Sequence, residues 1–157
     1  MELLVDTPER DASVRATSRS VDGQLDMSFN VRAEILGTVR DIVAAHLRWW
    51  RVDDGTAFRM LTVVNELFTN VLQHTPADAD GCRMAGLLLQ KVPDGVTAVV
   101  RDQDRRPPVY SSSALLAEEG RGLMLMGALA DDTSVSMTPA GKDVWVFMAV
   151  PELTEHL

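Results

Sequence analysis

The sequence has a single cysteine, Cys82, in 157 residues, and it lacks any long apolar run. One thiol can neither form an intrachain disulfide nor build a zinc site, which is typical of a protein in a reducing compartment. Apolar segments such as LMLMGALA and VWVFMAV are too short to span a bilayer, and the N-terminal MELLVDTPERD does not resemble a secretory signal. We therefore expect a cytoplasmic location and no membrane partner.

Basic residues are also scarce, since 15 Lys and Arg stand against 23 Asp and Glu and give a formal net charge of −8. A protein with this charge is repelled by phosphate backbones, so we expect no direct nucleic-acid partner. The hydrophobic fraction of 46% and the charged fraction of 24% are ordinary globular values. The length suits one domain that buries its own core.

The first half of the chain changes from a polar segment to helical periodicity. Residues 1–22 are polar and show no clear period, so we predict a flexible N-terminal arm before a single domain at 23–157. Apolar residues at 25, 27 and 29 alternate with polar ones and predict a strand. Three- and four-residue spacing then predicts a helix from 31 to 50. A second helix is predicted from about 56 to 74, capped by Asp53 or Asp54 and ended before Pro76.

The second half predicts two pairs of strands separated by a helix. Pro93-Asp94-Gly95 is a turn signal between two apolar strands, at about 82–92 and 96–101. A long connection at 102–119 precedes a short apolar helix at 120–130, and strands at 133–138 and 143–150 close the chain. The order β-α-α-β-β-α-β-β predicts an α+β fold, a two-layer sandwich with helices on one face of a mixed sheet.

The segment NELFTNVLQH, residues 65–74, places Glu66, Asn70 and His74 four residues apart, so the three side chains share a strip of the second helix. This strip has three interpretations. It is a solvated face, a zinc-type metal site or a magnesium-nucleotide site. Asn is a poor ligand for zinc, which counts against the second interpretation. In the last case the amide oxygen of Asn70 is a hard ligand for magnesium, and Glu66 positions or deprotonates an attacking hydroxyl.

Two later segments favour the nucleotide interpretation. Asp102 follows a predicted strand, and a carboxylate there can accept a hydrogen bond from an adenine amino group. Gly120 and Gly122 stand at the start of the predicted helix at 120–130. Glycines there let the backbone approach phosphate oxygens, and the free N–H groups of a helix N-terminus bind anions. The combination and order of these motifs are more informative than any one of them.

At this point the sequence resembles the histidine-kinase-like ATPases of the Bergerat fold, and more narrowly the small anti-sigma factor serine kinases. NELFTNVLQH is similar to the N box of this family, DQDRRPP to its first glycine box, GRGLMLMGALAD to its second, and GKDVWVFMAV to its closing strand. The resemblance covers about residues 25–150. It implies ATP and Mg²⁺ as cofactors, and a sigma factor or an antagonist protein phosphorylated on Ser or Thr as partner. Many members of the family are dimers, so the resemblance makes a homodimer one option for this chain, whose oligomeric state the sequence does not determine.

The resemblance also implies a role for each matching residue. Glu66 is the expected catalytic carboxylate, Asn70 the magnesium ligand, His74 a neighbour of the phosphates and Asp102 the adenine reader. Residues 103–119 are the expected lid. The other residues expected to border the nucleotide are Asp104, Gly120, Arg121, Gly122 and Leu123.

The chain departs from the family pattern at two places. Asp104 stands where the family usually has a glycine, and its side chain and charge are expected to crowd the nucleotide or repel its phosphates. Arg105 and Arg106 either offset that charge or are solvated residues of the lid, and we favour the second interpretation. Lys142 and Asp143 stand where family members often carry a threonine.

The leading hypothesis is therefore a regulatory protein Ser/Thr kinase of the anti-sigma factor type. The alternative is a catalytically decayed binding module that holds a protein partner without ATP turnover, which the departure at Asp104 favours. A sensor histidine kinase is less consistent with the sequence, because His46 precedes Leu47 and not an acidic residue. A metal-dependent hydrolase using Glu66 and His74 lacks sufficient ligands.

Overall fold

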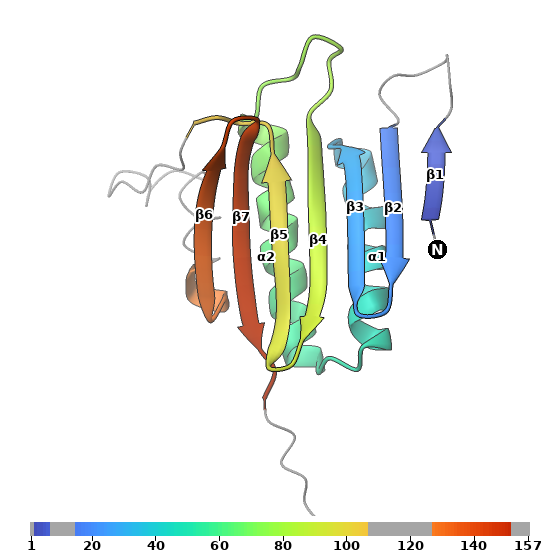
Figure 1. Ribbon diagram of the computed structural model, residues 1–157, viewed down its shortest axis with the longest axis vertical. Coiled ribbons are helices and arrows are strands. Elements are labelled where there is room, and N and C mark those ends of the chain that lie inside the picture. Colours follow the sequence, from blue (N-terminus) through green and yellow to red (C-terminus); the bar gives the residue numbers. More distant parts are fainter. Residues whose placement is uncertain (1, 7–14, 107–126, 152–157) are drawn as a thin grey trace, which may run out of the picture.

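The computed structural model describes residues 2–6, 15–106 and 127–151 as two helices behind one sheet (Figure 1). These residues form the two-layer α+β sandwich that the sequence predicted, with both helices covering the same face of the sheet (Figure 1). In chain order the elements are β1 (Glu2–Asp6), β2 (Arg15–Val21), β3 (Gln24–Asn30), α1 (Ala33–Trp49), α2 (Asp54–His74), β4 (Met84–Val92), β5 (Gly95–Asp102), β6 (Asp132–Thr138) and β7 (Gly141–Ala149).

The sheet has seven strands in the order β1-β2-β3-β4-β5-β7-β6, and every neighbouring pair is antiparallel. The prediction of a mixed sheet was therefore wrong in this detail. The connection between β3 and β4 contains the two helices that the sequence predicted, and their path sets the direction of β4. Helix α1 takes the chain away from the end of β3 and α2 brings it back, so β4 begins at that same end of the sheet (Figure 1).

The N-terminal residues correct a second prediction. Residues 15–21 and 2–6, which we expected in a flexible arm, form β2 and β1 and extend the sheet beyond β3. Small and polar side chains gave β2 no apolar period. The hairpin signal was nevertheless present, because Asp22-Gly23 is a typical two-residue turn and Gly23 adopts a φ of +72°.

A partly buried hydrogen bond ties β2 to the helical layer. Ser20 of β2 lies 2.9 Å from Nε2 of His46 on α1, and Nδ1 of the same ring lies 2.8 Å from the carbonyl oxygen of Ile42. Because Nδ1 donates its hydrogen to that carbonyl, Nε2 accepts from the Ser20 hydroxyl. His46 is 6% exposed. It therefore has a structural role, which agrees with the absence of an acidic neighbour in its sequence.

The core lies between the helices and the helix-facing side of β3, β4, β5 and β7. Helix α2 begins as predicted, because the Asp53 carboxylate accepts a hydrogen bond of 3.0 Å from the backbone N–H of Thr56. Its apolar side packs into the core, where the rings of Phe68 and Phe29 lie 4.9 Å apart. The buried apolar residues of this side are Met60, Val63, Val64, Leu67, Phe68 and Val71. This packing fixes which strip of α2 faces away from the core.

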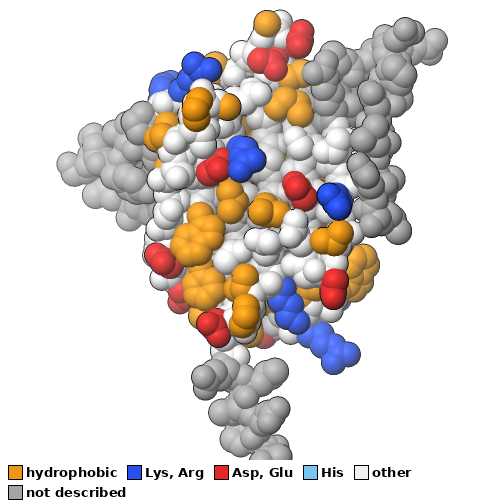
Figure 2. Space-filling model, in the orientation of Figure 1, with side chains coloured by type: hydrophobic (Ala, Val, Ile, Leu, Met, Phe, Trp, Pro, Cys, Tyr) orange, Lys and Arg blue, Asp and Glu red, His pale blue; other side chains and the backbone are white. Residues whose placement is uncertain are grey.

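None of the helices in the described part of the chain covers the other face of the sheet (Figure 1). Figure 2 views this face and shows hydrophobic side chains interspersed with acidic and basic ones. The rings of Trp145 and Phe147 stack on it at 6.4 Å, and Arg101 forms an ion pair of 2.8 Å with Asp143. The hydrogen bonds from Arg101 to Asp143 raise the pKa of the arginine above its ordinary value. In β5 and β7, even-numbered residues such as Val100 and Val146 are thus buried in the core, whereas odd-numbered residues lie on this other face.

Candidate functional site

Helix α2 carries the predicted polar strip. Glu66, Asn70 and His74 are each half-buried and lie one after another along the helix, next to its buried apolar side. Within the residues that the structure describes, the side chains of Glu66 and Asn70 have neither a hydrogen bond nor an ion pair. The two side chains are therefore not committed to holding the fold together, and they remain available to a ligand.

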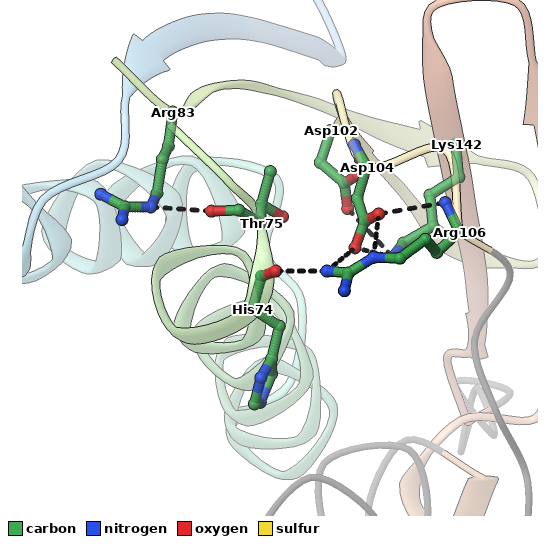
Figure 3. Close-up of polar contacts among 7 residues, drawn as sticks. All are labelled: His74, Thr75, Arg83, Asp102, Asp104, Arg106 and Lys142. Carbon is green, nitrogen blue, oxygen red and sulfur yellow. Dashed lines mark hydrogen bonds and ion pairs between the residues drawn. The ribbon is translucent and has the colours of Figure 1, made fainter. Parts of the chain in front are cut away.

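Asp102 lies where β5 ends, at the same end of the sheet as the C-terminus of α2 (Figure 3). It is 5% exposed and faces the helical layer. Its neighbour across the ladder is Lys142, the second residue of β7, whose Nζ lies 3.6 Å from Oδ2 of Asp102. The pairing requires a close approach of the two strands. A Cβ at Gly141 would collide with the Asp102 carbonyl oxygen and lie 2.7 Å from Cα of Gln103, so glycine is required there.

Asp104 and Arg106 complete what we call the polar cluster, which consists of Asp102, Asp104, Arg106 and Lys142 (Figure 3). The backbone N–H of Asp104 donates to Oδ1 of Asp102 at 2.7 Å. Arg106 donates to both carboxylate oxygens of Asp104, at 2.9 and 3.1 Å, and to the carbonyl oxygen of His74 at 2.6 Å. The cluster therefore connects the end of β5 to the C-terminus of α2.

This geometry refines the interpretation of Arg106. Its side chain is 66% exposed, as we favoured for a solvated residue, and it also pairs with Asp104, which was the other interpretation of the sequence. Arg105 is exposed. Asp104, expected to crowd or repel a nucleotide, is 7% exposed and held between Arg106 and Lys142, with Nζ of Lys142 at 3.7 Å. Its charge is therefore compensated inside the protein.

The two carboxyl groups of the cluster have opposite pKa shifts. Burial raises the pKa of Asp102 above its ordinary value, although the N–H of Asp104 and the charge of Lys142 act in the opposite direction. Burial also opposes ionisation of Asp104. There, however, the hydrogen bonds from Arg106 and the charge of Lys142 are stronger and hold the pKa below its ordinary value. Asp104 is thus the more firmly ionised carboxylate of the pair.

The backbone and the side chain of His74 face different surroundings. Its backbone carbonyl borders the polar cluster through Arg106, but its imidazole points away from Asp104 and Arg106 (Figure 3). The predicted phosphate-binding residues Gly120, Arg121, Gly122 and Leu123 lie outside the described residues, as does most of the predicted lid at 103–119. Of the predicted helix at 120–130, the structure describes only its end, where residues 127–129 are helical.

Gly141 had no assigned role in the sequence, and Lys142 was noted only as a departure from the family pattern. Both lie in the segment PAGK, which we interpreted as the connection between two strands, and they also begin the match of GKDVWVFMAV to the closing strand of the family. Finding their role requires the register of β7 against β5, since Lys142 meets Asp102 only through that pairing. Gly141, where β7 begins, is 39 positions after Asp102, where β5 ends, and no local pattern encodes such a register.

Other features of the described residues give no second site of the same kind. A hollow of about 460 Å³ lies on the open face of the sheet, and its lining includes Asp26, Ser28, Arg101 and Asp143. Within the described ranges, no group of three or more His, Cys, Asp or Glu side chains is arranged to hold a metal ion. Among the helices of those ranges, none has the length and apolar character needed to cross a membrane.

The fold and the site together define a two-layer α+β domain with a candidate ligand site where the C-terminus of α2 meets the ends of β5 and β7. The family model of the histidine kinase-like ATPase domain matches residues 29–148, and the chain therefore belongs to this family. The match begins inside β3 and ends inside β7, so β1 and β2 lie outside it. Comparison with curated proteins gave no significant match.

Among solved structures, the chain is similar to the RsbU and RsbW domains of Rv1364c from Mycobacterium tuberculosis. The TM-score is 0.61 at 16% sequence identity, and the similarity covers 84% of this chain. It covers only 34% of that structure, so the chain spans about a third of the other protein's length. The likeness supports the fold, and it carries no residue-level assignment at this identity.

Proposed function

We propose that the chain is a regulatory ATP-binding protein of the anti-sigma factor kinase type. One observation carries the proposal. Glu66 and Asn70 lie one turn apart on α2, half-buried and with neither a hydrogen bond nor an ion pair among the described residues. The same helix ends at the polar cluster that contains Asp102, the proposed base-reading residue, through the hydrogen bond from Arg106 to the carbonyl of His74 (Figure 3). Membership of the histidine kinase-like ATPase family supports ATP as the nucleotide.

The residues present fit a magnesium-nucleotide group by their chemistry. The amide oxygen of Asn70 is a hard ligand of the kind that Mg²⁺ accepts, and bound magnesium supplies neutralisation of phosphate charge. The carboxylate of Asp102 accepts hydrogen from an adenine amino group. We keep Gly120, Arg121, Gly122 and Leu123 as the proposed border of the phosphates, and His74 as a further neighbour of them.

In the proposed reaction a Ser or Thr hydroxyl of a small antagonist protein is phosphorylated. Glu66 orients that hydroxyl and accepts its proton while the new O–P bond forms to the γ-phosphoryl group. The bond between that phosphorus and the β–γ bridging oxygen breaks, and ADP leaves. The same protein would alternately hold a sigma factor. The cytoplasmic location expected from the sequence remains a prediction, and the homodimer remains an option.

The decisive experiment is a calorimetric titration with ATP, in the presence and absence of magnesium. The full chain should bind ATP more tightly with magnesium than without it. In the presence of magnesium, Asn70→Ala should bind ATP about tenfold or more weakly than the unmodified chain, because a charge-assisted contact is lost. Gln73→Ala is the matched control, since Gln73 is exposed on the same helix. A titration without heat at millimolar ATP contradicts the proposal.

Phosphotransfer is tested separately with γ-labelled ATP. Label should appear on Ser or Thr of a small protein that co-purifies with the chain, and Glu66→Ala should slow its appearance by about 10² to 10⁴, the usual contribution of a general base. Gln73→Ala should leave the rate unchanged. Transfer that proceeds equally fast in Glu66→Ala removes Glu66 from the chemistry.

A second candidate, a binding module that holds a partner without ATP turnover, is favoured by a specific observation. Both carboxylate oxygens of Asp102 already have partners inside the chain, the N–H of Asp104 at Oδ1 and the ammonium of Lys142 near Oδ2. For such a module, partner binding would be unaffected by ATP and by Asn70→Ala. For the kinase, ATP would change partner affinity.

A further inference from the structure

Lys142 has an unusual position for a lysine. Its side chain is 16% exposed, and its Nζ lies 3.6 Å from Oδ2 of Asp102 and 3.7 Å from Oδ2 of Asp104. These separations allow ion pairs but exceed the 2.7–3.2 Å typical of a hydrogen bond. The ammonium group is thus held in place by charge while its N–H donors retain capacity for another acceptor.

A largely buried N–H donor without a close acceptor is costly, and a ligand that supplies the acceptor recovers that cost. The same reasoning applies to the neighbouring carboxylate. Oδ1 of Asp102 is used by the N–H of Asp104, whereas Oδ2 has, among the described residues, only the long ion pair with Lys142. Side by side, the cluster therefore presents one hydrogen-bond acceptor, Oδ2, and one donor, Nζ.

Adenine presents the complementary pair. Its exocyclic amino group is a donor, and a ring nitrogen on either side of that group, N1 or N7, is an acceptor. We propose that Lys142 is a base-reading residue. Asp102 accepts a hydrogen bond from the adenine amino group, and Lys142 donates one to the ring nitrogen beside that group. This inference rests on the proposed ATP site, and it assigns to Lys142 a specificity-determining role in that site.

Asp104 and Arg106 explain why a lysine can occupy this place. Asp104 also attracts the ammonium, and Arg106 fixes Asp104 by three hydrogen bonds and is itself bound to the carbonyl of His74. Gly141 allows β7 to approach β5 closely enough to bring Lys142 there. Lys142 is therefore positioned by the fold and not by a nucleotide.

The test compares ATP with 1-deaza-ATP and 7-deaza-ATP, each of which replaces one ring nitrogen by a carbon that cannot accept a hydrogen bond. The unmodified chain should bind one of the two analogues about 10- to 100-fold more weakly than ATP, the usual range for a hydrogen bond to a charged group. Lys142→Met keeps the aliphatic stem and should bind ATP and that analogue equally. Lys142→Gln, which retains an N–H donor, should recover part of the discrimination.

Lys91→Met is the matched control, because Lys91 is exposed on β4 and the substitution is the same. It should discriminate between ATP and the analogues as the unmodified chain does. The comparison of nucleotides on the unmodified chain needs no variant, so a folding defect at position 142 does not prevent the test.

Failure of this inference and failure of the proposed function give different results. If the unmodified chain binds no ATP, the proposed function and this inference fall together. If it binds ATP and both analogues equally well, only the role of Lys142 is refuted. Tighter ATP binding by Lys142→Met would also refute it, since the ammonium would then obstruct the base.

Discussion

Substitution of Gly141 by alanine tests the close approach of β5 and β7 on which the polar cluster depends. The added Cβ would collide with the carbonyl oxygen of Asp102 and would lie 2.7 Å from Cα of Gln103 and 2.8 Å from the carbonyl carbon of Asp102. All three atoms belong to the backbone, so no flexible side chain can move aside. The ends of the two strands must separate.

We expect the free energy of unfolding of Gly141→Ala to fall by about 1–3 kcal/mol, the usual cost of overpacking. For a chain of this size, 1 kcal/mol corresponds to about 2–4 °C in the melting temperature, so the midpoint should fall by about 2–12 °C. Circular dichroism during heating measures this shift. Separation of the strands also moves Lys142 from Asp102, so ATP affinity should fall even at temperatures where the variant is folded.

Gly37→Ala is the matched control for this prediction. Gly37 lies inside α1, and the nearest atom to its added Cβ is the flexible end of Arg40 at 3.7 Å, an ordinary contact. Alanine in a helix interior is favoured over glycine by about 0.5–1 kcal/mol, so this variant should melt at a higher temperature than the unmodified chain. A Gly141→Ala chain that melts at or above the unmodified one would refute the close approach and the lysine position derived from it.

Two further predictions concern β2 and the polar cluster. Ser20→Ala removes the only partner of Nε2 of the buried His46 within the described residues and should lower the free energy of unfolding by about 1–3 kcal/mol, measured by urea denaturation. Because the pKa of Asp104 lies below its ordinary value of 3.8, its ionised form stabilises the folded chain above that pH. The unmodified chain should therefore be more stable than Asp104→Asn by a constant amount near neutral pH, and this difference should shrink as pH falls below about 4. Urea midpoints at each pH measure the difference. A constant difference down to about pH 2 contradicts the assignment.

The sequence predicted those parts of the fold that follow a local period. The helix cap at Asp53, the apolar side of α2 and the hairpin between β4 and β5 appear where expected, because each depends on neighbouring residues only. Strand β2 was missed, since its side chains are small and polar and it is held by its backbone ladder to β3 and by the hydrogen bond from Ser20. The direction of β4 depends on the path of two helices, which a strand pattern does not contain.

The candidate site divides in the same way. Glu66 and Asn70 were predictable together because helical spacing alone places them on one strip. Asp102 was predictable as a residue at a strand end. Its partner Lys142 was not, because the pairing of β5 with β7 joins residues far apart in sequence. Site residues along one helix can thus be predicted from sequence, whereas site residues on different strands can be paired only when the register of those strands is known.

The charges of the polar cluster alter the meaning of its least typical residue. Taken alone, Asp104 adds a negative charge beside a proposed nucleotide and should repel phosphates. In the structure two carboxylates, Asp102 and Asp104, are matched by one ammonium and one guanidinium, so the cluster has no formal net charge when all four groups are ionised. The local repulsion is therefore largely cancelled at short range. Because Arg106 also binds the last carbonyl of α2, the groups that cancel the charge also fix the position of β5 against the helix that carries Glu66 and Asn70.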